Sequence, residues 1–162
     1  MNKFKKISKK QLNKDFKEEV NLIKPKRGTA LSAGYDFFNP YKKDIVIYPS
    51  ETINIPTGFK IMLNKQNVLL IAIRSSLGFK YNIRLVNQLG VIDSDYYNNE
   101  SNEGHIWVKI KNEGDKKVVI KSNEAIAQGI ITKFLLVEGD NLEGKKRVGG
   151  IGSTNKESSN VS

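Results

Sequence analysis

The 162-residue chain contains no cysteine and a single histidine, His105. A disulfide framework is therefore excluded, and a zinc centre built from Cys and His ligands is not expected. Any metal would be bound through oxygen atoms. No apolar run approaches the roughly 18 residues needed to span a bilayer, and the N-terminus lacks the apolar stretch of a signal peptide. We expect a cytoplasmic protein with no membrane partner.

The formal net charge of +10 is concentrated at the start of the chain. Residues 1–27 hold ten Lys or Arg against three Asp or Glu, whereas the remainder holds 17 against 14. A basic head could adhere to nucleic acid or to a membrane surface. Since the body is nearly neutral, we interpret the head as a solvated charged helix and expect no stable nucleic-acid binding.

The length suits one domain with one core. Ser8-x-x-Gln11 is a capping-box pattern, and Phe4, Ile7, Leu12 and Phe16 fall near one stripe at helical spacing. Together these features predict a short amphipathic helix from Lys9 to about Lys17. We therefore divide the chain into a basic helical segment (1–19), a β domain (20–137) and a flexible, glycine-rich C-terminal arm (138–162). The arm holds too few apolar side chains to anchor it.

Short apolar runs separated by turn residues follow residue 28, which predicts an all-β sandwich or barrel. The expected strands are 35–38, 45–48, 52–55, 59–63, 68–73, 83–86, 106–111, 118–120 and 126–136. In the strand 106–111 apolar and polar residues alternate, as in a half-buried strand. His105 has no carboxylate at ligand spacing, so we expect a surface strand residue there.

The segment from Leu89 to Tyr97 places two carboxylates and an aromatic residue directly after an apolar turn that contains Gly90. Unpaired buried carboxylates are costly, so Asp93 and Asp95 are not expected in a core. A hairpin from Asn87 to Tyr96 that lines a cleft could use one carboxylate as a base and the other as a structural anchor.

Four further segments complete a family pattern. They are Ala33-Gly34-Tyr35-Asp36-Phe37, Arg74-Ser75-Ser76-Leu77-Gly78, Ala127-Gln128-Gly129 and Arg147-Val148-Gly149-Gly150-Ile151-Gly152-Ser153-Thr154. In order and approximate spacing, the five segments resemble the motifs of the homotrimeric dUTPases (deoxyuridine triphosphate nucleotidohydrolases). The resemblance implies an all-β, dUTPase-like jelly-roll β-barrel with a short N-terminal helix and a flexible C-terminal arm. It also implies a homotrimer with three shared sites.

The same resemblance implies a reaction. The enzyme would hydrolyse dUTP to dUMP and diphosphate, with Asp93 activating the water that attacks the α-phosphorus. Such an activity limits uracil incorporation into DNA and supplies dUMP. Each site would take the Asp93 segment from one subunit, the phosphate motifs from a second and the arm from a third.

The phosphate ligands are expected at two of the motifs. An apolar strand is followed by Arg74, Ser75 and Ser76. Their guanidinium and two hydroxyls can donate hydrogen bonds to phosphate oxygens. By resemblance, Arg74 and Ser75 bind the phosphate chain. The other predicted phosphate ligands are Gln128, Arg147, Gly150, Gly152, Ser153 and Thr154.

The nucleoside is expected at the Asn87 to Tyr96 hairpin, because backbone amides and the Asn87 side chain can pair with a pyrimidine edge. By resemblance, Tyr96 lies under the deoxyribose and excludes a 2′-hydroxyl. Asp95 is interpreted as a structural anchor. The predicted ligands of uracil and deoxyribose are Asn87, Gly90, Val91, Tyr96 and Ile151.

A Mg²⁺ ion is the expected cofactor. By resemblance, Asp36 and Gln128 hold its water shell and do not bind it directly, which suits an ion that keeps several waters and is carried by substrate phosphates. A structural carboxylate is the alternative for Asp36. The chain departs from the family at Ile151, where Phe is usual, and at Ala125, where Arg is usual. The polar loop 98–104 is longer than the common pattern.

Two other functions stay open. A dCTP deaminase shares the fold by resemblance, but it requires a Glu on the strand after the hairpin, and residues 105–110 contain none. A nucleotide-sensing regulator or partner-binding protein on the same scaffold could use the basic head and the loop 98–104 to bind a partner.

Overall fold

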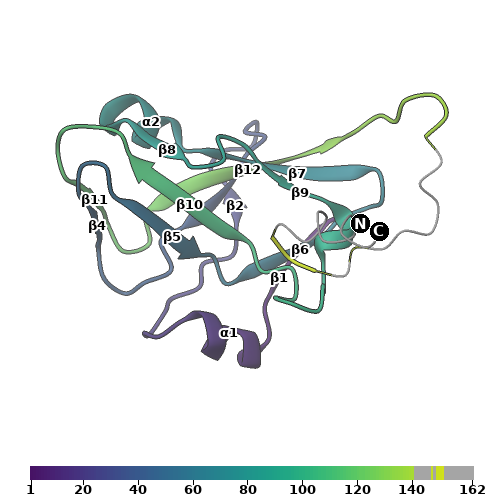
Figure 1. Ribbon diagram of the computed structural model, residues 1–162, viewed down its shortest axis with the longest axis horizontal. Helices are drawn as coiled ribbons and strands as arrows, with labels where there is room; N and C mark the ends of the chain where they lie inside the picture. The colour runs from purple at the N-terminus through teal and green to yellow at the C-terminus, as the bar shows by residue number, and fades with distance from the viewer. Residues whose placement is uncertain (141–146, 148, 152–162) are drawn as a thin grey trace, which may run out of the picture.

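The computed structural model of the protein describes residues 1–140, 147 and 149–151 (Figure 1). Strands dominate these residues. They are β1 (Lys3–Lys6), β2 (Lys26–Arg27), β3 (Tyr35–Phe38), β4 (Ile45–Ile47), β5 (Thr52–Pro56), β6 (Phe59–Met62), β7 (Asn67–Ile73), β8 (Ile83–Leu85), β9 (Gly90–Ile92), β10 (Trp107–Asn112), β11 (Val118–Ile120) and β12 (Ala125–Lys133). The helices are α1 (Lys9–Asp15), α2 (Ser75–Tyr81) and the 3-10 turn η1 (Ser94–Tyr96).

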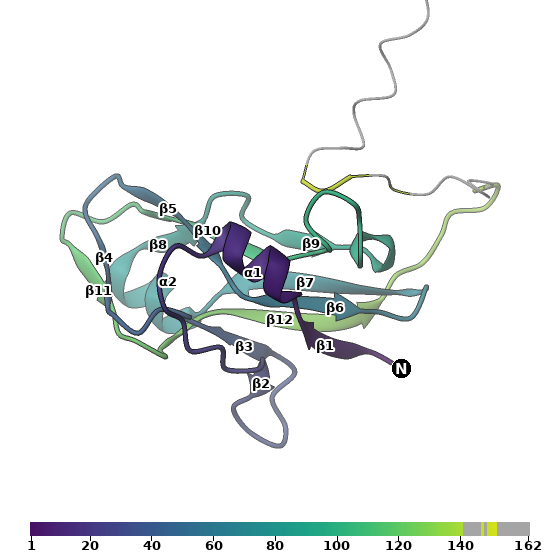
Figure 2. The same cartoon turned by 90° about the horizontal axis from the view of Figure 1, so that it is seen from below.

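The strands of the described residues form four antiparallel sheets. The largest has the order β2-β3-β12-β7-β9, and a second has the order β5-β10-β8. The pairs β1-β6 and β11-β4 complete the layers seen edge-on in Figure 2. The predicted all-β architecture is confirmed.

The core lies between these sheets, and the alternation of β10 shows how it is filled. Ile106, Val108 and Ile110 are at most 1% exposed, whereas Lys109 between them is exposed. Side chains of a strand alternate between its two faces, so this half-buried strand is as predicted. Burial of a large aliphatic side chain stabilises the fold by about 1.5–3 kcal/mol.

The predicted N-terminal helix is confirmed as α1, with Ser8 as its N-cap. The Ser8 hydroxyl accepts a hydrogen bond from the Gln11 backbone N–H at 3.1 Å, as a capping residue should. A strand precedes this helix, which the sequence did not predict. β1 pairs with β6 and places Phe4 in the core, so Phe4 belongs to a strand and not to the apolar stripe of the helix.

A second helix, α2, begins directly after Arg74 and ends at Asn82, whose φ of 53° is left-handed. This helix was not predicted from the sequence, because Gly78 is a weak helix former in the middle of a seven-residue segment. Both α-helices of the described residues have seven residues, and neither is long enough to cross a membrane.

The predicted hairpin from Asn87 to Tyr96 is wrong in one respect. β8 pairs with β10 and β9 pairs with β7, so the two strands belong to different sheets. The connection between them crosses from one layer to the other. A cavity opens where the two sheets separate.

Candidate active site

This cavity has a volume of about 250 Å³ and lies between β7, β9, η1 and β10. It contains every residue that the sequence assigned to the nucleoside. Its lining residues are Ile71, Leu85, Asn87, Gly90, Val91, Ile92, Tyr96, Trp107, Lys109, Arg147 and Ile151. Most of them are apolar, with a few polar groups at the rim, which is the composition of small-molecule sites.

Tyr96 forms part of the cavity wall and is only 4% exposed. Its hydroxyl donates to the His105 carbonyl at 3.0 Å and accepts from the Asn102 side-chain amide at 2.8 Å. Burial raises the pKa of this phenol, so it stays protonated. Because the hydroxyl already donates one hydrogen bond and accepts another, the ring is the part of Tyr96 that is available to a ligand.

Asp93 directly follows β9 and precedes η1, and its carbonyl accepts from the Tyr96 backbone N–H at 3.2 Å. Its side chain is 47% exposed, and that of Asp95 is 51% exposed. In an extended segment, residues two apart such as Asp93 and Asp95 would lie on one face. The turn η1 is found instead, and it still brings both carboxylates to the same cation.

That cation is Arg147 of the arm. Arg147 Nη2 donates to Asp93 Oδ2 at 3.1 Å, and Nε lies 3.3 Å from Asp95 Oδ1. The second contact is an ion pair without hydrogen-bond alignment, which leaves the buried Nε without a hydrogen-bond partner in the described part of the chain. The guanidinium also lies 5.6 Å from the centre of the Tyr96 ring. The sequence assigns Arg147 to phosphate, and that role stays a prediction.

Two more of the predicted ligands in the arm, Ile151 and Gly150, are among the described residues. Ile151 lines the cavity, although its side chain is 79% exposed. Gly150 is buried against the loop 98–104, where a Cβ would collide with the Ser101 hydroxyl. Three predicted phosphate ligands, Gly152, Ser153 and Thr154, lie outside the described residues.

The other predicted phosphate and metal residues form a second cluster. Arg74 Nη1 donates to Asp36 Oδ1 at 2.8 Å, and Asp36 is opposite Gln128 in the β3-β12 register. Ser75 and Gln128 line a cavity of about 470 Å³ beside α2, and Ser76 is exposed next to Ser75. These predicted residues thus lie near one another, and their roles toward phosphate and metal stay predictions. The Arg74–Asp36 pair was not predicted from the sequence.

The two clusters are separate within one chain. The cavity beside α2 and the cavity at Tyr96 share no lining residue. In Figure 1, α2 lies near one end of the molecule and η1, after β9, lies toward the other. One chain alone does not bring Asp93 together with Arg74, Ser75 and Ser76, although Arg147 of the same chain does contact Asp93.

The described side chains around Asp36 do not form a metal-binding cage of their own. No group of three or more His, Cys, Asp or Glu side chains that could hold one occurs among the described residues. Asp36 is already paired with Arg74, and Gln128 contributes a neutral amide. These residues fit a Mg²⁺ ion held mainly by substrate phosphates and their waters, and they do not fit a dedicated protein cage.

His105 is the residue that sequence reasoning placed wrongly. It is 0% exposed, and its Nδ1 lies 2.6 Å from Asp15 Oδ2 in the N-terminal helix. Its Nε2 accepts from the Gly58 backbone N–H at 2.8 Å. The expectation of a surface residue failed because Asp15 is 90 positions away in the sequence, and spacing rules see only local ligands.

Comparison with known proteins decides the family. A dUTPase family model matches residues 20–155. The deoxyuridine 5′-triphosphate nucleotidohydrolase of Lactococcus lactis is 44% identical over 131 residues, which cover 80% of this chain and 86% of that protein. The enzyme of the same name from Wigglesworthia glossinidia is 36% identical, with 83% of each chain covered. The chain belongs to the dUTPase family.

The structural comparison agrees. The crystal structure of the Streptococcus mutans dUTPase, 37% identical, superimposes with a TM-score of 0.69 over 84% of this chain and 98% of the other. The dUTPase-like fold predicted from the five motifs is confirmed. The cavity at Tyr96 and the cluster at Arg74 are therefore parts of a dUTPase fold.

Proposed function

We propose that this protein is a dUTP diphosphatase, which hydrolyses dUTP to dUMP and diphosphate. One observation carries the assignment. In a member of the dUTPase family, Asp93 lies beside a cavity that contains all five residues predicted to bind the nucleoside. A carboxylate that borders a nucleoside cavity can activate a water at the α-phosphate of the bound nucleotide.

In the proposed reaction, Asp93 accepts a proton from water while the water oxygen bonds to the α-phosphorus. The bond from the α-phosphorus to the bridging oxygen breaks, and diphosphate leaves with the electron pair. Negative charge grows on the leaving group, so cationic and hydroxyl donors lower the barrier. Arg74, Ser75 and Ser76 supply such donors, and Arg147 with Gly150, Gly152, Ser153 and Thr154 adds those of the arm.

Asp36 and Gln128 would hold the water shell of a Mg²⁺ ion that is bound mainly by the substrate phosphates. When bound, the ion neutralises phosphate charge. Asp36 has a second task in this chain, because its carboxylate holds the Arg74 guanidinium at 2.8 Å. That contact uses one of the five guanidinium N–H donors and leaves others for phosphate.

Selectivity for deoxyribose is assigned to Tyr96. Its hydroxyl is engaged by His105 and Asn102, so the ring cannot rotate away from the cavity without breaking two hydrogen bonds. A ring held this way leaves little room for a 2′-hydroxyl. Asn87, Gly90 and Val91 offer the polar edge for uracil, and Ile151 would cover it.

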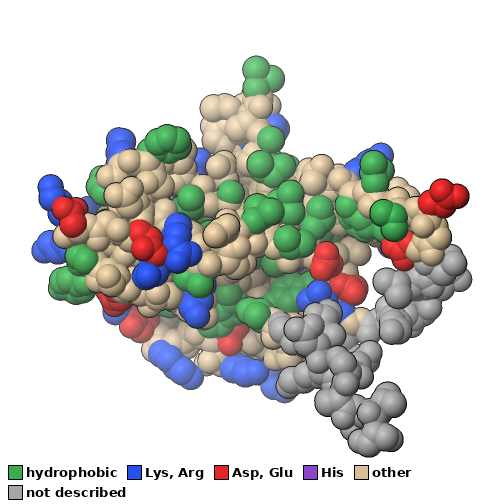
Figure 3. Space-filling view, turned by 45° about the horizontal axis from the view of Figure 1, so that its top comes forward, with side chains coloured by type: hydrophobic (Ala, Val, Ile, Leu, Met, Phe, Trp, Pro, Cys, Tyr) green, Lys and Arg blue, Asp and Glu red, His purple; other side chains and the backbone are tan. Residues whose placement is uncertain are grey.

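We further propose that the active unit is a homotrimer. The separation of the two clusters within one chain supports shared sites. Exposed apolar side chains support them as well, because large apolar surfaces on a folded protein usually mark contacts. Leu31, Phe79 and Leu135 are 98%, 92% and 94% exposed. Figure 3 shows hydrophobic side chains gathered in a band across one face.

The deaminase alternative finds no support, because β10 carries no Glu. A cytoplasmic location and the absence of stable nucleic-acid binding stay predictions.

The deciding experiment measures diphosphate release from dUTP, UTP, dCTP and dTTP with Mg²⁺. Hydrolysis of dUTP with little turnover of the other three is expected. Equal rates on UTP and dUTP would contradict the role of Tyr96, and no turnover of dUTP would contradict the activity. Light scattering of the same sample measures the mass, for which three chains are expected.

A further inference from the structure

The polar loop 98–104 is a rigid unit. Asn99 Oδ1 accepts from the backbone N–H groups of Ser101 and Asn102, each at 3.1 Å. Gly104 has a φ of 78°, and a Cβ there would collide with the Tyr96 carbonyl, so glycine is required. The loop is therefore fixed against the residue that forms the wall of the nucleoside cavity.

One side of this loop binds the N-terminal helix. Glu103 accepts from the Ser8 backbone N–H at 3.0 Å and from the Ser8 hydroxyl, and its ion pair with Lys60 measures 3.1 Å. The two Ser8 donors and Lys60 lower the pKa of Glu103 to about 2. Lys14 donates to the Ser101 carbonyl at 3.4 Å. Both ends of α1 are thus attached to the loop.

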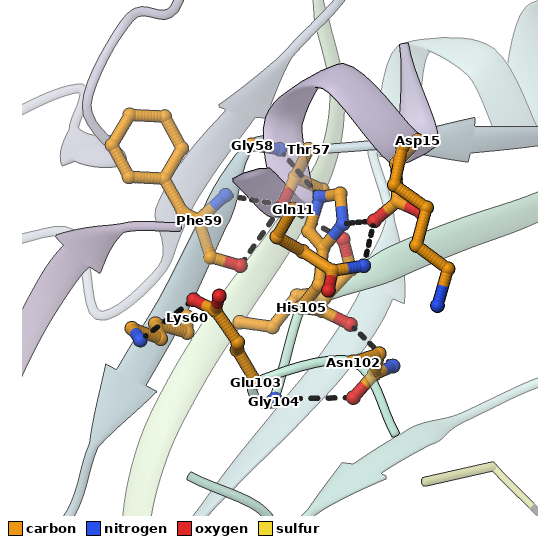
Figure 4. Close-up of polar contacts among 12 residues, drawn as sticks. Gln11, Asp15, Thr57, Gly58, Phe59, Lys60, Asn102, Glu103, Gly104 and His105 are labelled. Atoms are coloured by element: carbon orange, nitrogen blue, oxygen red, sulfur yellow. Dashed lines mark hydrogen bonds and ion pairs between the residues drawn. The ribbon is translucent and has the colours of Figure 1, made fainter. Parts of the chain in front are cut away.

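A chain of hydrogen bonds continues from the helix to His105 (Figure 4). Asp15 Oδ2 accepts from the Gln11 side-chain amide at 2.7 Å and lies 2.6 Å from His105 Nδ1. Because the Gly58 N–H donates to Nε2, the proton of the neutral imidazole is on Nδ1, where Asp15 accepts it. The carbonyl of this same His105 accepts the Tyr96 hydroxyl.

The other side of the loop faces the site. Asn102 donates from its side-chain amide to the Tyr96 hydroxyl at 2.8 Å. Ser101 and Asn102 are also the nearest neighbours of a Cβ built at Gly150 of the arm. The loop thus lies between α1 on one side and two parts of the proposed nucleoside site on the other.

We propose that α1 is a positioning element of the nucleoside site. Asp15 acts through His105 and the loop 98–104, which together hold the Tyr96 ring in place. The same loop holds the surface against which Gly150 packs. This inference rests on the proposed function. Asp15 and His105 touch neither nucleotide nor reacting atoms, so they are positioning residues. Their loss leaves Asp93 and Arg74 intact and changes how well the sugar fits.

The test compares Asp15→Ala with the conservative Asp15→Asn. An amide oxygen can still accept from His105 Nδ1–H and from Gln11, whereas Ala leaves both donors unpaired. In Asp15→Ala we expect KM for dUTP to rise roughly tenfold, the equivalent of about 1.4 kcal/mol. We expect kcat to change by less than about threefold, and the preference for dUTP over UTP to narrow. Asp15→Asn should stay close to the wild type.

A second readout is independent of turnover. Calorimetry with the non-hydrolysable α,β-imido analogue of dUTP should show about tenfold weaker binding to Asp15→Ala. Glu18→Ala is the matched control, since Glu18 lies in the same basic segment but pairs with Lys43 at 2.8 Å. If Asp15→Ala fails to fold, Glu103→Ala removes the acceptor of both Ser8 donors without touching the buried imidazole, and it carries the same expectation.

Wild-type activity separates the two proposals. No dUTP hydrolysis by the wild type would overturn the proposed function. With an active wild type, unchanged KM and unchanged dUTP preference in folded Asp15→Ala would overturn the positioning role. An equal loss of kcat on dUTP and UTP without a change in KM would overturn it as well, because that pattern indicates general damage. Failure of Asp15→Asn to restore the wild-type values would exclude the hydrogen bond as the cause.

Discussion

The Arg74 guanidinium donates to the Asp36 carboxylate at 2.8 Å, which joins β3 to the start of α2. The two side chains are 36% and 11% exposed, so the pair is partly shielded from water and stronger than a surface ion pair. Asp36, which is expected near the metal, thereby orients Arg74, which is expected at the phosphates.

Asp36→Asn should raise the Mg²⁺ concentration that gives half-maximal activity by severalfold and should also raise KM for dUTP. The amide keeps the size of the side chain but loses the charge that orients both Arg74 and metal-bound water. A Mg²⁺ titration of dUTP hydrolysis checks this. Asp44→Asn is the control, since Asp44 pairs with Lys121 on the surface. Superimposable titration curves for Asp36→Asn and wild type would rule out the assignment.

Asp93→Asn should keep the assembly and bind nucleotide, with turnover lower by roughly 10² to 10⁴, the usual contribution of a positioned base. Asp95→Asn removes the neighbouring carboxylate that contacts the same Arg147, and it should cost much less. Single-turnover rates of both variants provide the comparison. If the two substitutions reduce the rate equally, the carboxylates act only as anchors of Arg147 and neither is the base.

Stability should fall below about pH 6.5 because of His105. Burial lowers the pKa of this imidazole below 6.5, against the opposing effect of Asp15. The folded protein therefore resists a proton that the unfolded chain accepts, so stability is complete above the unfolded pKa and declines as the pH falls. The slope is at most about 1.4 kcal/mol per pH unit.

Denaturant unfolding between about pH 5 and 8 measures this slope. His105 is the only histidine in the chain, so His105→Gln should abolish most of the pH dependence in this range. An unchanged slope in that variant would assign the titration to another group.

Ile151→Phe should tighten binding of the dUTP analogue, by an amount bounded by the roughly 1 to 3 kcal/mol of base-aromatic stacking. The side chain lines the nucleoside cavity and is 79% exposed, so a ring has room there. Leu135→Phe, on an exposed side chain outside the cavity lining, is the control. Calorimetry decides, and equal affinities in both variants would show that the arm closes on another path.

The sequence predicted those parts of the site that are local in the chain. Residues from Asn87 to Tyr96 follow one another closely, so a cavity that they line could be expected from their order. Many of the strands could also be predicted from the sequence, because alternation of apolar and polar residues such as that of β10 is a local signal. His105 was placed wrongly because its partners Asp15 and Gly58 come from distant segments. The strand β1 was missed because its four residues, Lys3–Lys6, hold one apolar side chain among three lysines.

The position of β12 between β3 and β7 determines when the central sheet can form during synthesis. Within the described part of the chain, residues 35–38 pair with β12 and β2, and β7 pairs with residues 127–133 along its whole length. Until the ribosome has released residue 133, β3 and β7 hold unpaired N–H and C=O groups beside apolar side chains such as Phe37 and Leu69. Such edges recruit other chains. The nascent chain therefore exposes these edges to association with other chains until β12 emerges.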